Sequence, residues 1–555
     1  MMLPEDMRLW VAKDHFVWFL IEVTGGLDTT AVEALARPGK GRPGYDPVML
    51  AVLLIYAYCQ GERSSRRIEA RCRTDAAFRV ATGNAVPDHS TICRFRAAAA
   101  GPGGPLEDLF FKVLFVLAAA GLGRLDVIAV DGSKIWANAS RHANRTEAGL
   151  RKLARQILDD AARADGQDCS CAGHEHGAAA GLAGPDACGC CDGGTLPGLG
   201  LDGPAVPRGG WGGASRAQRI AAGLAELEEL RETREAARRE AAEAYLAAAR
   251  DGQPPRGAVP AEIAVEVARI RLERCEAADA ATDARWAEPG ARRPGRRRSG
   301  DSARTRKARD QLTAAEAARA AADDAAAAQA GHDAARAGHD GEDAGKKNNN
   351  KKQAGPVRNI TDPDSQIMHC TRHGVVQAYN CQIPRTRDRV FLLPRATRDP
   401  NDSAQLIPAF EAIAASAAVI AAGHAAGGHP SFWSRTGTVL SGTGYLSKAN
   451  CQAPGPDRLI GTGGNWKDTT PDHHPATCRH DDPRDQMACH LSTRQGRDLY
   501  RCRAPISESG FAHLKTTIGL RQLAMRGLAK ATGELLLACT AANLLLLHRH
   551  ALRTT

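Results

Sequence analysis

The sequence predicts an α/β protein in which a mixed sheet is preceded by an all-helical segment and interrupted by a long insertion. Three observations predict this fold class. The first hundred residues carry helix caps and helical spacing, and short apolar runs rich in β-branched residues occur at residues 127–130 and again after residue 359. The stretch between them is poor in large apolar residues, so it cannot build a dense core by itself. At 555 residues the chain exceeds one ordinary domain.

The charge balance favours a polyanionic partner. Lysine and arginine number 73 against 63 acidic residues, a formal net charge of +10, and the charges cluster. Clustered positive charge is most often a nucleic-acid surface, although solvated basic loops give the same count. The absence of a basic, apolar leader and the shortness of the apolar runs predict a cytoplasmic protein without a membrane span. The sixteen cysteines are then expected to be mostly free thiols.

The amino-terminal segment reads as a series of short helices. Asp46 is the expected N-cap of a helix that has Pro47 at its first position and ends at Gly61. A basic helix follows in ERSSRRIEARCRT, and a third begins at PDHST, where Asp88 or Ser90 is the expected cap. Helices with an arginine-rich surface are typical of helix-turn-helix DNA readers, and equally of a packing domain with a solvated face. The arginines concerned are Arg63, Arg66, Arg67, Arg71, Arg94 and Arg96.

The first strand ends in a candidate metal ligand. Residues 127–130 form an apolar run that predicts a strand buried on both faces, and Asp131 follows directly, before Gly132. A carboxylate at the carboxyl end of a buried strand lies where open α/β sheets bind ligands and metals. The alternative is an ordinary turn, because Asp-Gly is a common turn dipeptide.

The insertion, residues 146–355, is expected to contain helices and low-complexity sequence. Ile220, Leu224, Leu227 and Leu230 form the apolar stripe of one helix, and a second begins near Ile263; the two either pair as a hairpin or dimerise. Residues 285–309 carry ten basic and two acidic side chains, typical of a phosphate-attracting arm or of a solvated linker. An Ala-rich run and GKKNNNKKQAG close the segment.

A cysteine- and histidine-rich stretch lies inside the insertion. Thiolates and imidazoles at this density are zinc ligands in many proteins, but the spacings CxC, HxH and CxCC differ from the usual CxxC. Zinc binding and a loop of free thiols therefore both stay open, with zinc the less favoured. The residues are Cys169, Cys171, His174, His176, Cys188, Cys190 and Cys191.

Regular structure is expected again from residue 359. The segment NITDPDSQIMHCTRHGVVQAYNCQI predicts a turn followed by a strand. DRVFLLPRATRDPNDSAQLIPAF predicts a strand, a loop and a helix that starts near Asp402, and residues 438–440 predict another strand. The order strand, insertion, strand, strand, helix, strand fits a ribonuclease H-like sheet. In such a sheet three carboxylates hold two metal ions.

Both ends of the chain resemble one family. YDP, SSRRIE and PDHSTI followed by FR resemble the InsH-type amino-terminal domain of bacterial insertion-sequence transposases, and TDPDS, VQAYN, NDSAQL and GTGYLSKAN resemble their DDE catalytic core. The resemblance implies DNA-end binding and assembly by the amino-terminal domain, through the arginines named above. It implies domains at residues 1–110, 120–145 and 356–555, with 146–355 as the insertion.

The chemistry of this family needs acidic residues. Cleavage of a phosphodiester requires an activated oxygen nucleophile and neutralised phosphate charge, which two Mg²⁺ (or Mn²⁺) ions held by carboxylates supply. Asp131 provides the first carboxylate. In the helix after residue 503, Phe511, Leu514 and Ile518 form the buried stripe and Glu508 and Lys515 share its border. YR.R..I.E..F..LK also resembles the family's third-carboxylate signature.

The second carboxylate is missing. In the family it lies two positions before the glycine of GY, which here is Gly442, and no Asp or Glu occurs from residue 433 to 456. Asp457 and Asp468 come too late to replace it. Losing one of three ligands removes charge that keeps two divalent ions together, so weak activity is expected.

Three functions follow as hypotheses. The first is a DDE-type DNA transposase of an insertion sequence, which binds terminal inverted repeats and target DNA, at least as a homodimer, and catalyses metal-dependent cleavage and strand transfer. The second is a catalytically inactive, transposase-derived DNA-binding protein. The third is an unrelated helical scaffold centred on the cysteine- and histidine-rich stretch.

Overall fold

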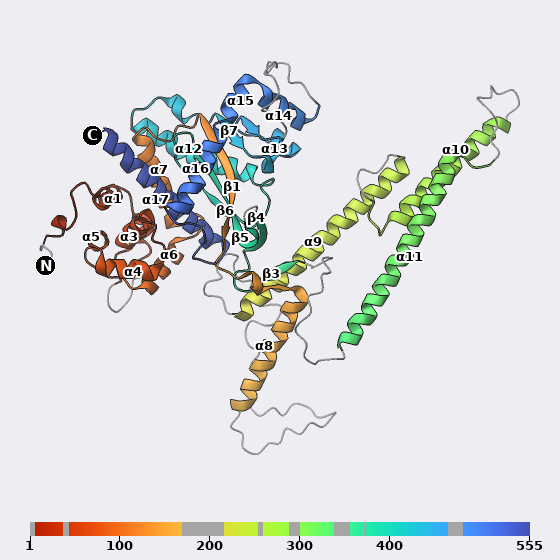
Figure 1. Ribbon diagram of the computed structural model, residues 1–555, viewed down its shortest axis with the longest axis horizontal. Coiled ribbons are helices and arrows are strands. Elements are labelled where there is room, and N and C mark those ends of the chain that lie inside the picture. Colours follow the sequence, from red (N-terminus) through yellow and green to blue (C-terminus); the bar gives the residue numbers. More distant parts are fainter. Residues whose placement is uncertain are drawn as a thin grey trace. The chain divides into compact units, whose positions relative to one another are not determined.

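A computed structural model describes residues 6–36, 44–168, 216–252, 259–287, 300–337, 356–370, 373–463 and 481–554 (Figure 1). Its contacts divide the chain into two compact units, which are described separately. The first unit combines Met1–Leu224 with Pro356–Thr555, and the second is Ala225–Gly355. The amino-terminal helices and the sheet thus belong to the same unit.

The amino-terminal part of the first unit is helical, as predicted. Asp46 caps α3 by accepting a hydrogen bond from the Val48 amide at 2.9 Å, and Asp88 caps α6 by accepting from Ser90 and Thr91, both at 3.0 Å. These two predicted helix starts are confirmed. The elements are η1 (Met7–Leu9), α1 (Phe16–Gly25), α2 (Thr30–Glu33), α3 (Pro47–Cys59), α4 (Ser65–Thr74), α5 (Ala76–Ala81), α6 (His89–Ala99) and α7 (Pro105–Ala119).

A six-stranded sheet forms the centre of the unit. Its order is β4-β5-β1-β7-β8, with β6 beside β5; β1 runs antiparallel to β5 and parallel to β7. The strands are β1 (Val127–Trp136), β4 (Gln366–Cys370), β5 (Gly374–Thr386), β6 (Arg395–Thr397), β7 (Thr438–Ser441) and β8 (Arg458–Ile460).

The first strand differs from its prediction in a way that matters for the site. The sequence predicted a strand that ended at Val130, whereas β1 continues to Trp136 because β5 pairs with it along its length. The pairing with β7 does stop at Val130. Asp131 therefore lies inside β1, one residue past the point where this strand loses its β7 neighbour.

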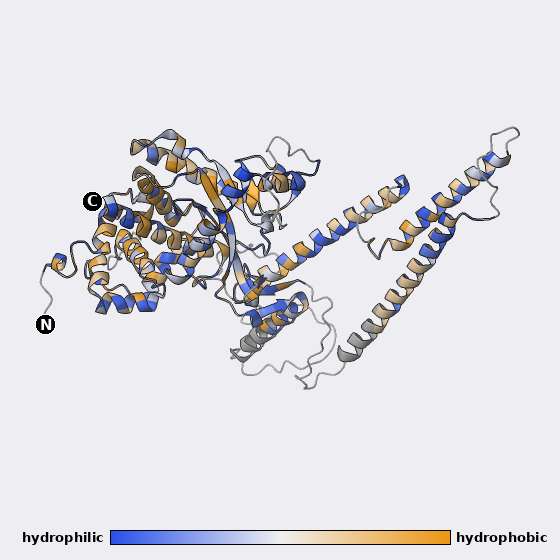
Figure 2. Cartoon of the chain, turned by 45° about the horizontal axis from the view of Figure 1, so that its top comes forward, coloured by the Kyte–Doolittle hydropathy of each residue, from blue (hydrophilic) through white to orange (hydrophobic). Residues whose placement is uncertain are grey.

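Apolar helices cover the sheet. The helix that follows β6 starts at Leu406 rather than near Asp402. The helices are α12 (Leu406–Ala426), α13 (Lys448–Gln452), α14 (Pro483–Ser492), α15 (Arg494–Tyr500), α16 (Arg503–Thr516) and α17 (Leu528–Thr554), with η3 (Ser431–Ser434) and η4 (Thr443–Tyr445). Among the described residues, α12 and α17 are long and apolar enough for a membrane span. Inside the fold, α12 packs on α7, and α17 packs on α3 and α7. Figure 2 shows the apolar residues gathered in this part of the molecule.

A small two-stranded sheet holds the two ends of the insertion. It is made of β2 (Asn144–Thr146) and β3 (Val357–Asn359), which pair so that Thr146 lies opposite Val357; η2 (Arg141–Ala143) precedes it and α8 (Glu147–Asp168) follows. The two ends of the insertion are thus held side by side. The cysteine- and histidine-rich stretch at residues 169–191 lies outside the described residues.

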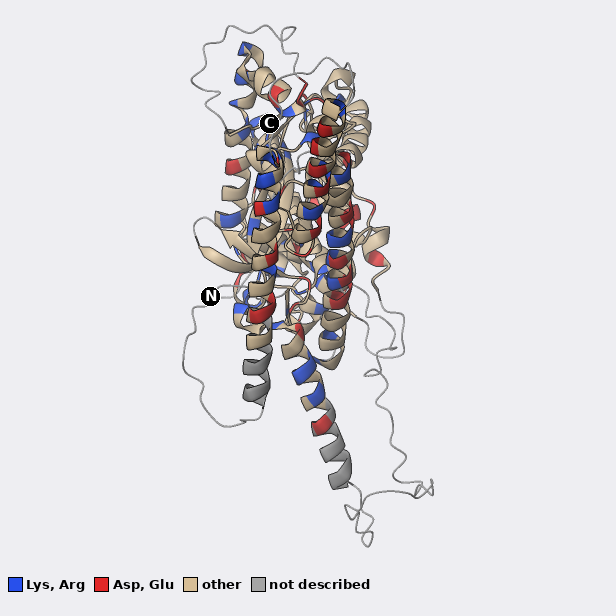
Figure 3. Ribbon diagram, turned by 90° about the vertical axis from the view of Figure 1, so that its right-hand side faces the viewer, with Lys and Arg blue, Asp and Glu red and all other residues tan. Residues whose placement is uncertain are grey.

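The second unit consists of long helices with mixed charge. They are the main part of α9 (Arg216–Asp251), α10 (Ala264–Ala287) and α11 (Ala303–Ala337). The sequence predicted that the first two of these either pair as a hairpin or dimerise. Among the described residues α10 packs mainly on α11, which contains the Ala-rich run, and Arg274 of α10 donates to the Ala249 carbonyl of α9 at 3.3 Å. Asp279 of α10 joins the pair by accepting from the Ser302 amide at 2.9 Å and the Thr305 hydroxyl at 2.6 Å. Acidic and basic side chains alternate along the long helices (Figure 3).

Candidate active site and nucleic-acid interface

Asp131 is the first acid of the candidate active site. Its Oδ2 lies 3.2 Å from Arg503 Nη1, and its Oδ1 accepts a hydrogen bond from the Gly132 amide at 3.0 Å. Burial raises the pKa of the Asp131 carboxyl, the Arg503 charge and the Gly132 amide oppose the rise, and the charges of Asp402 and Glu508 add to it. Asp131 is therefore a partly buried carboxylate within electrostatic reach of two others.

Helix α16 brings the other two predicted catalytic side chains to Asp131. Lys515 Nζ donates to Ser133 Oγ at 2.5 Å, and Arg503 binds Asp131 from the start of the same helix. Because Asp131 and Ser133 are two residues apart, both point to the face of β1 that α16 covers. Glu508 is solvent-exposed and its charge acts on Asp131. The three residues predicted from the sequence are thus gathered on one face of the sheet.

Position 442 also faces this site, but it supplies no ligand. Gly442 follows β7 with φ −76° and ψ 175°, an extended conformation that any residue adopts. A Cβ built on it would lie 3.6 Å from Arg503 Nη1, with no closer atom beyond its chain neighbours. A side chain at 442 would therefore meet the guanidinium that binds Asp131, which is where the family resemblance puts the second acid.

Asp402 is an acidic neighbour that the sequence did not reveal. It accepts hydrogen bonds from Asn380 Nδ2 at 2.7 Å and Gln382 Nε2 at 2.8 Å. Gln382 lies opposite Gly132 across the β1–β5 pair, so these groups occupy the face away from Asp131. A Cβ on Gly132 would lie 2.5 Å from Asp402 Oδ1, so only glycine leaves room for this carboxylate.

The donor set does not fit a two-ion site. Within the described ranges, no group of three or more His, Cys, Asp or Glu side chains is placed to hold a metal ion. Asp131 and Glu508 contribute two negative charges, Arg503 neutralises one of them, and Gly442 contributes none. Asp402 is engaged on the other face by Lys134, whose Nζ lies 3.5 Å from Oδ1, and by the two amides.

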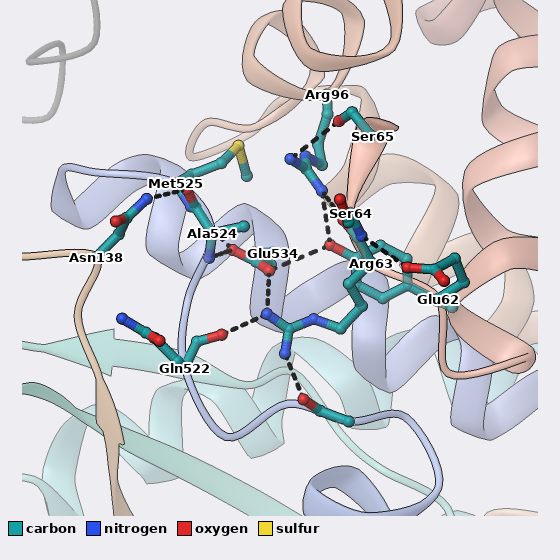
Figure 4. A network of polar contacts seen from close by, with 12 residues as sticks. Glu62, Arg63, Ser64, Ser65, Arg96, Asn138, Gln522, Ala524, Met525 and Glu534 are labelled. Carbon is teal, nitrogen blue, oxygen red and sulfur yellow. Dashed lines mark hydrogen bonds and ion pairs between the residues drawn. The ribbon is translucent and has the colours of Figure 1, made fainter. Parts of the chain in front are cut away.

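Two of the six predicted DNA-binding arginines serve the protein interior instead (Figure 4). Arg63 Nη2 lies 3.0 Å from Oε1 of the fully buried Glu534, and its Nη1 donates to the Gly519 carbonyl at 2.6 Å. Arg96 is 4% exposed and donates to the Arg63 carbonyl at 2.8 Å. Glu534 also accepts from the Ala524 amide at 2.7 Å. The network ties the amino-terminal helices to the carboxyl-terminal segment, so both guanidinium groups are engaged.

The other four predicted arginines are exposed, and three of them line a groove. Arg66, Arg67 and Arg94 lie around a cavity of about 820 Å³, together with Arg521 from the segment before α17. None of the described residues that line it is acidic. Arg71 lies outside the groove, 3.4 Å from Asp75. Arg67 Nε also lies 3.1 Å from Oε1 of Glu62, which does not line the cavity. A concave surface with several exposed arginines attracts phosphate groups.

Two family models of transposase domains match the two ends of this chain. Residues 5–98 match the family model described as a transposase domain (DUF772), which covers all six arginines. Residues 467–548 match the model described as a transposase DDE domain, which includes Glu508, Lys515 and Glu534. This order is consistent with an insertion-sequence DDE transposase and confirms the resemblance found in the sequence; Asp131 and Gly442 lie outside both matches.

A transposase DDE domain implies a ribonuclease H-like fold, and such domains generally act with a divalent metal such as Mg²⁺. The helical start and the later mixed sheet agree with that implication. Neither the curated proteins nor the solved structures include a match to this chain.

Proposed function

We propose that this chain is a DNA transposase of an insertion sequence by descent, with a ribonuclease H-like core, and that this copy binds double-stranded DNA without cutting it efficiently. One observation carries the proposal: the charge of Glu508 acts on Asp131, and a glycine occupies position 442 beside Arg503, the ion-pair partner of Asp131. The frame of a DDE site is present, and one of its three acids is not.

The electrostatics explain the expected loss of cleavage. Divalent ions at such a site supply charge neutralisation and an activated oxygen nucleophile. Here the two remaining carboxylates carry two negative charges, and the Arg503 guanidinium 3.2 Å from Asp131 offsets one of them. Lys515 on the same helix offsets the other, so the site lacks the net negative charge that would hold divalent ions.

DNA binding is assigned to the groove at the amino-terminal helices. Arg66, Arg67 and Arg94 replace the full set of six arginines as the proposed contacts, and Arg521 joins them from the DDE domain. Their exposed guanidinium groups hold phosphates of the terminal inverted repeats. Since synapsis of two ends needs two copies, a homodimer or larger assembly on DNA, in the cytoplasm, is part of the proposal.

A cleavage and strand-transfer assay tests the proposal on linear DNA that carries the element's own ends, with Mg²⁺ or Mn²⁺. We expect the natural chain to shift this DNA without efficient cutting, and Gly442→Asp to gain metal-dependent cutting that Asp131→Ala or Glu508→Ala abolishes again. Gly442→Asn is the control, because it has the same shape without the charge. Absence of any gain in Gly442→Asp would count against the proposal.

An active transposase is the second candidate function, and Asp402 favours it. Its charge reaches Asp131 in spite of its position on the other face of β1. If the natural chain cuts efficiently and Asp402→Asn removes that activity as fully as Asp131→Ala does, Asp402 supplies the missing carboxylate. If Asp402→Asn leaves cutting unchanged, this candidate loses its support.

A further inference from the structure

A second basic cavity lies in the first unit, away from the groove of the amino-terminal helices. It encloses about 590 Å³ between the loop after β5, α16 and α17. Four arginines and two histidines line it, and one acidic side chain, Asp388, does so too. The six basic residues are Arg385, Arg389, His513, Arg549, His550 and Arg553.

The one acid of the cavity is already engaged. Asp388 Oδ2 accepts hydrogen bonds from the backbone amides of Gly123 at 2.7 Å and Arg124 at 3.2 Å, and its Oδ1 accepts from the Thr386 hydroxyl. In the described part of the chain, no carboxylate forms an ion pair with any of the four arginines of the cavity. Four guanidinium charges thus face a single carboxylate, Asp388, so the lining of the cavity keeps an excess of positive charge.

Arg385 is the innermost of these cations. Its side chain is buried, with 6% of the residue exposed, and Nη1 donates to the Ile506 carbonyl at 2.9 Å and to Ser509 Oγ at 2.7 Å. Both partners are neutral, and a buried guanidinium without an anion is costly. Burial and the nearby Arg389 charge lower the pKa of Arg385 to about 10, only partly opposed by Asp388.

The imidazole of His513, which also lines the cavity, is affected by the same positive charges. Burial lowers the pKa of His513 on α16, and the charges of Arg549 and Arg385 lower it further. A bound anion would relieve both effects, because it supplies the negative charge that the cavity lacks. The arginines thus come from β5, the loop after it and α17, and α16 contributes the neutral imidazole of His513 to the same concave space.

We propose that this cavity binds a phosphate group, and that the backbone of DNA supplies it. Ser509, which lines the cavity, follows Glu508 directly on α16, so the cavity adjoins the candidate active site. One strand of duplex DNA carries a phosphate about every 3.4 Å of axis, so DNA at Glu508 brings further phosphates past this wall. The inference rests on the proposed DNA binding, but it does not depend on whether the chain cuts DNA.

DNA titrations of the full chain in EDTA test this inference without any cutting. The variant Arg549→Ala/Arg553→Ala removes two exposed cations of the cavity, and Arg389→Gly removes a third while keeping its backbone φ of +76°, which glycine adopts freely. The matched control is Arg387→Ala, in the same loop but outside the cavity, with its side chain 59% exposed.

The expected readout is the salt dependence of binding to an end-bearing duplex. Each lost phosphate contact reduces the slope of log affinity against log salt by about 1, and weakens binding roughly tenfold near 0.1 M salt. The cavity variants show this loss and Arg387→Ala does not. Equal effects in all three variants would overturn the proposal, because they would report only a change in overall charge.

A second measurement separates DNA from small phosphates. Inorganic pyrophosphate is added to each protein and the melting temperature is recorded. We expect it to stabilise the natural chain and Arg387→Ala, but not the cavity variants. If pyrophosphate stabilises the natural chain but not the cavity variants, and the salt slope for DNA is the same in all of them, the cavity binds a small phosphate and not DNA. If the cavity variants behave like the natural chain in both measurements, the cavity is not a phosphate site. Failure of Gly442→Asp to cut DNA would affect only the proposed function.

Discussion

The residue at position 442 determines how much negative charge lies beside Asp131 in the candidate active site. The backbone there is extended, the space beside it is open and Arg503 faces it, so the fold accommodates an acid that the sequence lacks. The neighbouring glycine differs. A Cβ at Gly444 would lie 3.2 Å from Asp402 Oδ2, so a side chain at 444 would crowd an existing carboxylate.

Gly442→Asp is therefore expected to raise the affinity for Mn²⁺, measured by electron paramagnetic resonance or calorimetry, while the melting temperature stays close to that of the natural chain. The new carboxylate adds a third negative charge beside Asp131. Gly444→Asp is the contrasting variant: it places like charge against Asp402 and is expected to destabilise the fold without improving metal affinity. Equal Mn²⁺ binding by the two variants would contradict the assignment of position 442.

The carboxyl of Asp362 is expected to make the free energy of unfolding depend on pH. Burial raises the pKa of its carboxyl to about 6, although Tyr379 Oη donates to it at 2.8 Å and the Gly527 amide at 3.1 Å. Between the ordinary value of about 4 and this raised value, the folded state binds more protons than the unfolded state. Stability contributed by the protonated form is therefore lost as the pH rises through this window.

We expect the free energy of unfolding of the natural chain, relative to Asp362→Asn, to fall by on the order of 3 kcal/mol between about pH 4 and pH 6. Denaturant titrations of both proteins across this range measure the difference. A relative stability that rises with pH would mean that the Tyr379 and Gly527 hydrogen bonds outweigh burial.

The basic segment that contains α4 combines two roles on two faces. Arg63 points inward to Glu534, whereas Arg66 points to solvent at the groove. The sequence shows only a run of arginines, and helical spacing alone does not reveal which of them meets a carboxylate from the other end of the chain.

Substitutions in this segment are expected to separate stability from DNA binding. Arg63→Met breaks a buried ion pair and leaves Glu534 without its cation, which costs about 3 to 5 kcal/mol. Arg66→Ala changes stability by no more than about 0.5 kcal/mol but weakens DNA binding and lowers its salt slope by about 1. Thermal melts and DNA titrations on both variants check this; a stable Arg63→Met protein with weakened DNA binding would reverse the two assignments.

The first unit is made of two separate stretches of the sequence. The small β2–β3 sheet pairs the residues on either side of the insertion that separates them. Because Thr146 and Val357 are paired directly, a two-residue Asn-Gly turn can join them in place of residues 147–356. The shortened chain is expected to keep the first unit folded, with a melting temperature within a few degrees of the natural one. Circular dichroism melts test this.

The control deletion removes residues 216–356 but keeps α8. It exposes Leu150, which is fully buried and would lie 3.3 Å from a Cβ on Gly223 of α9. We expect this protein to be less soluble than the Asn-Gly version. Loss of folding in the Asn-Gly version would show that the insertion supports the core. A reduced salt slope for DNA would show that the insertion contributes phosphate contacts, of which the basic residues 285–309 are one candidate source.

Local features of the fold were predictable from the sequence, and long-range ones were not. The caps at Asp46 and Asp88 and the buried run at residues 127–130 depend on a few neighbouring residues. By contrast, the length of β1 is set by β5, and the α10–α11 pairing joins helices whose charge patterns are much alike. The resemblance to DDE transposases could be found in the sequence because short motifs, such as PDHSTI and GTGYLSKAN, occur in the same order as in that family.

The same limit applies to the candidate site. Asp131, Glu508 and Lys515 came from strand and helix positions, and the structure gathers them on one face. Arg503, Asp402 and the cavity at Arg385 had no spacing signal, because each depends on which face of a strand or helix meets which partner. The zinc expectation concerns residues outside those described and stays a prediction.

Because strands far apart in the sequence pair in the central sheet, β1 is synthesised long before the strands that pair with it. A ribosome adds about 5 to 20 residues per second, so the chain between Trp136 and Gly374 takes on the order of 10 to 50 s to emerge. During that interval the nascent β1 has neither β5 nor β7 beside it, and its apolar edge is open to chaperones and to the same strand on neighbouring ribosomes. Arg63 stays without its ion-pair partner for longer still, since Glu534 is made after all the strands of the sheet. The copy number of this protein in a cell is therefore expected to depend on chaperone supply during translation.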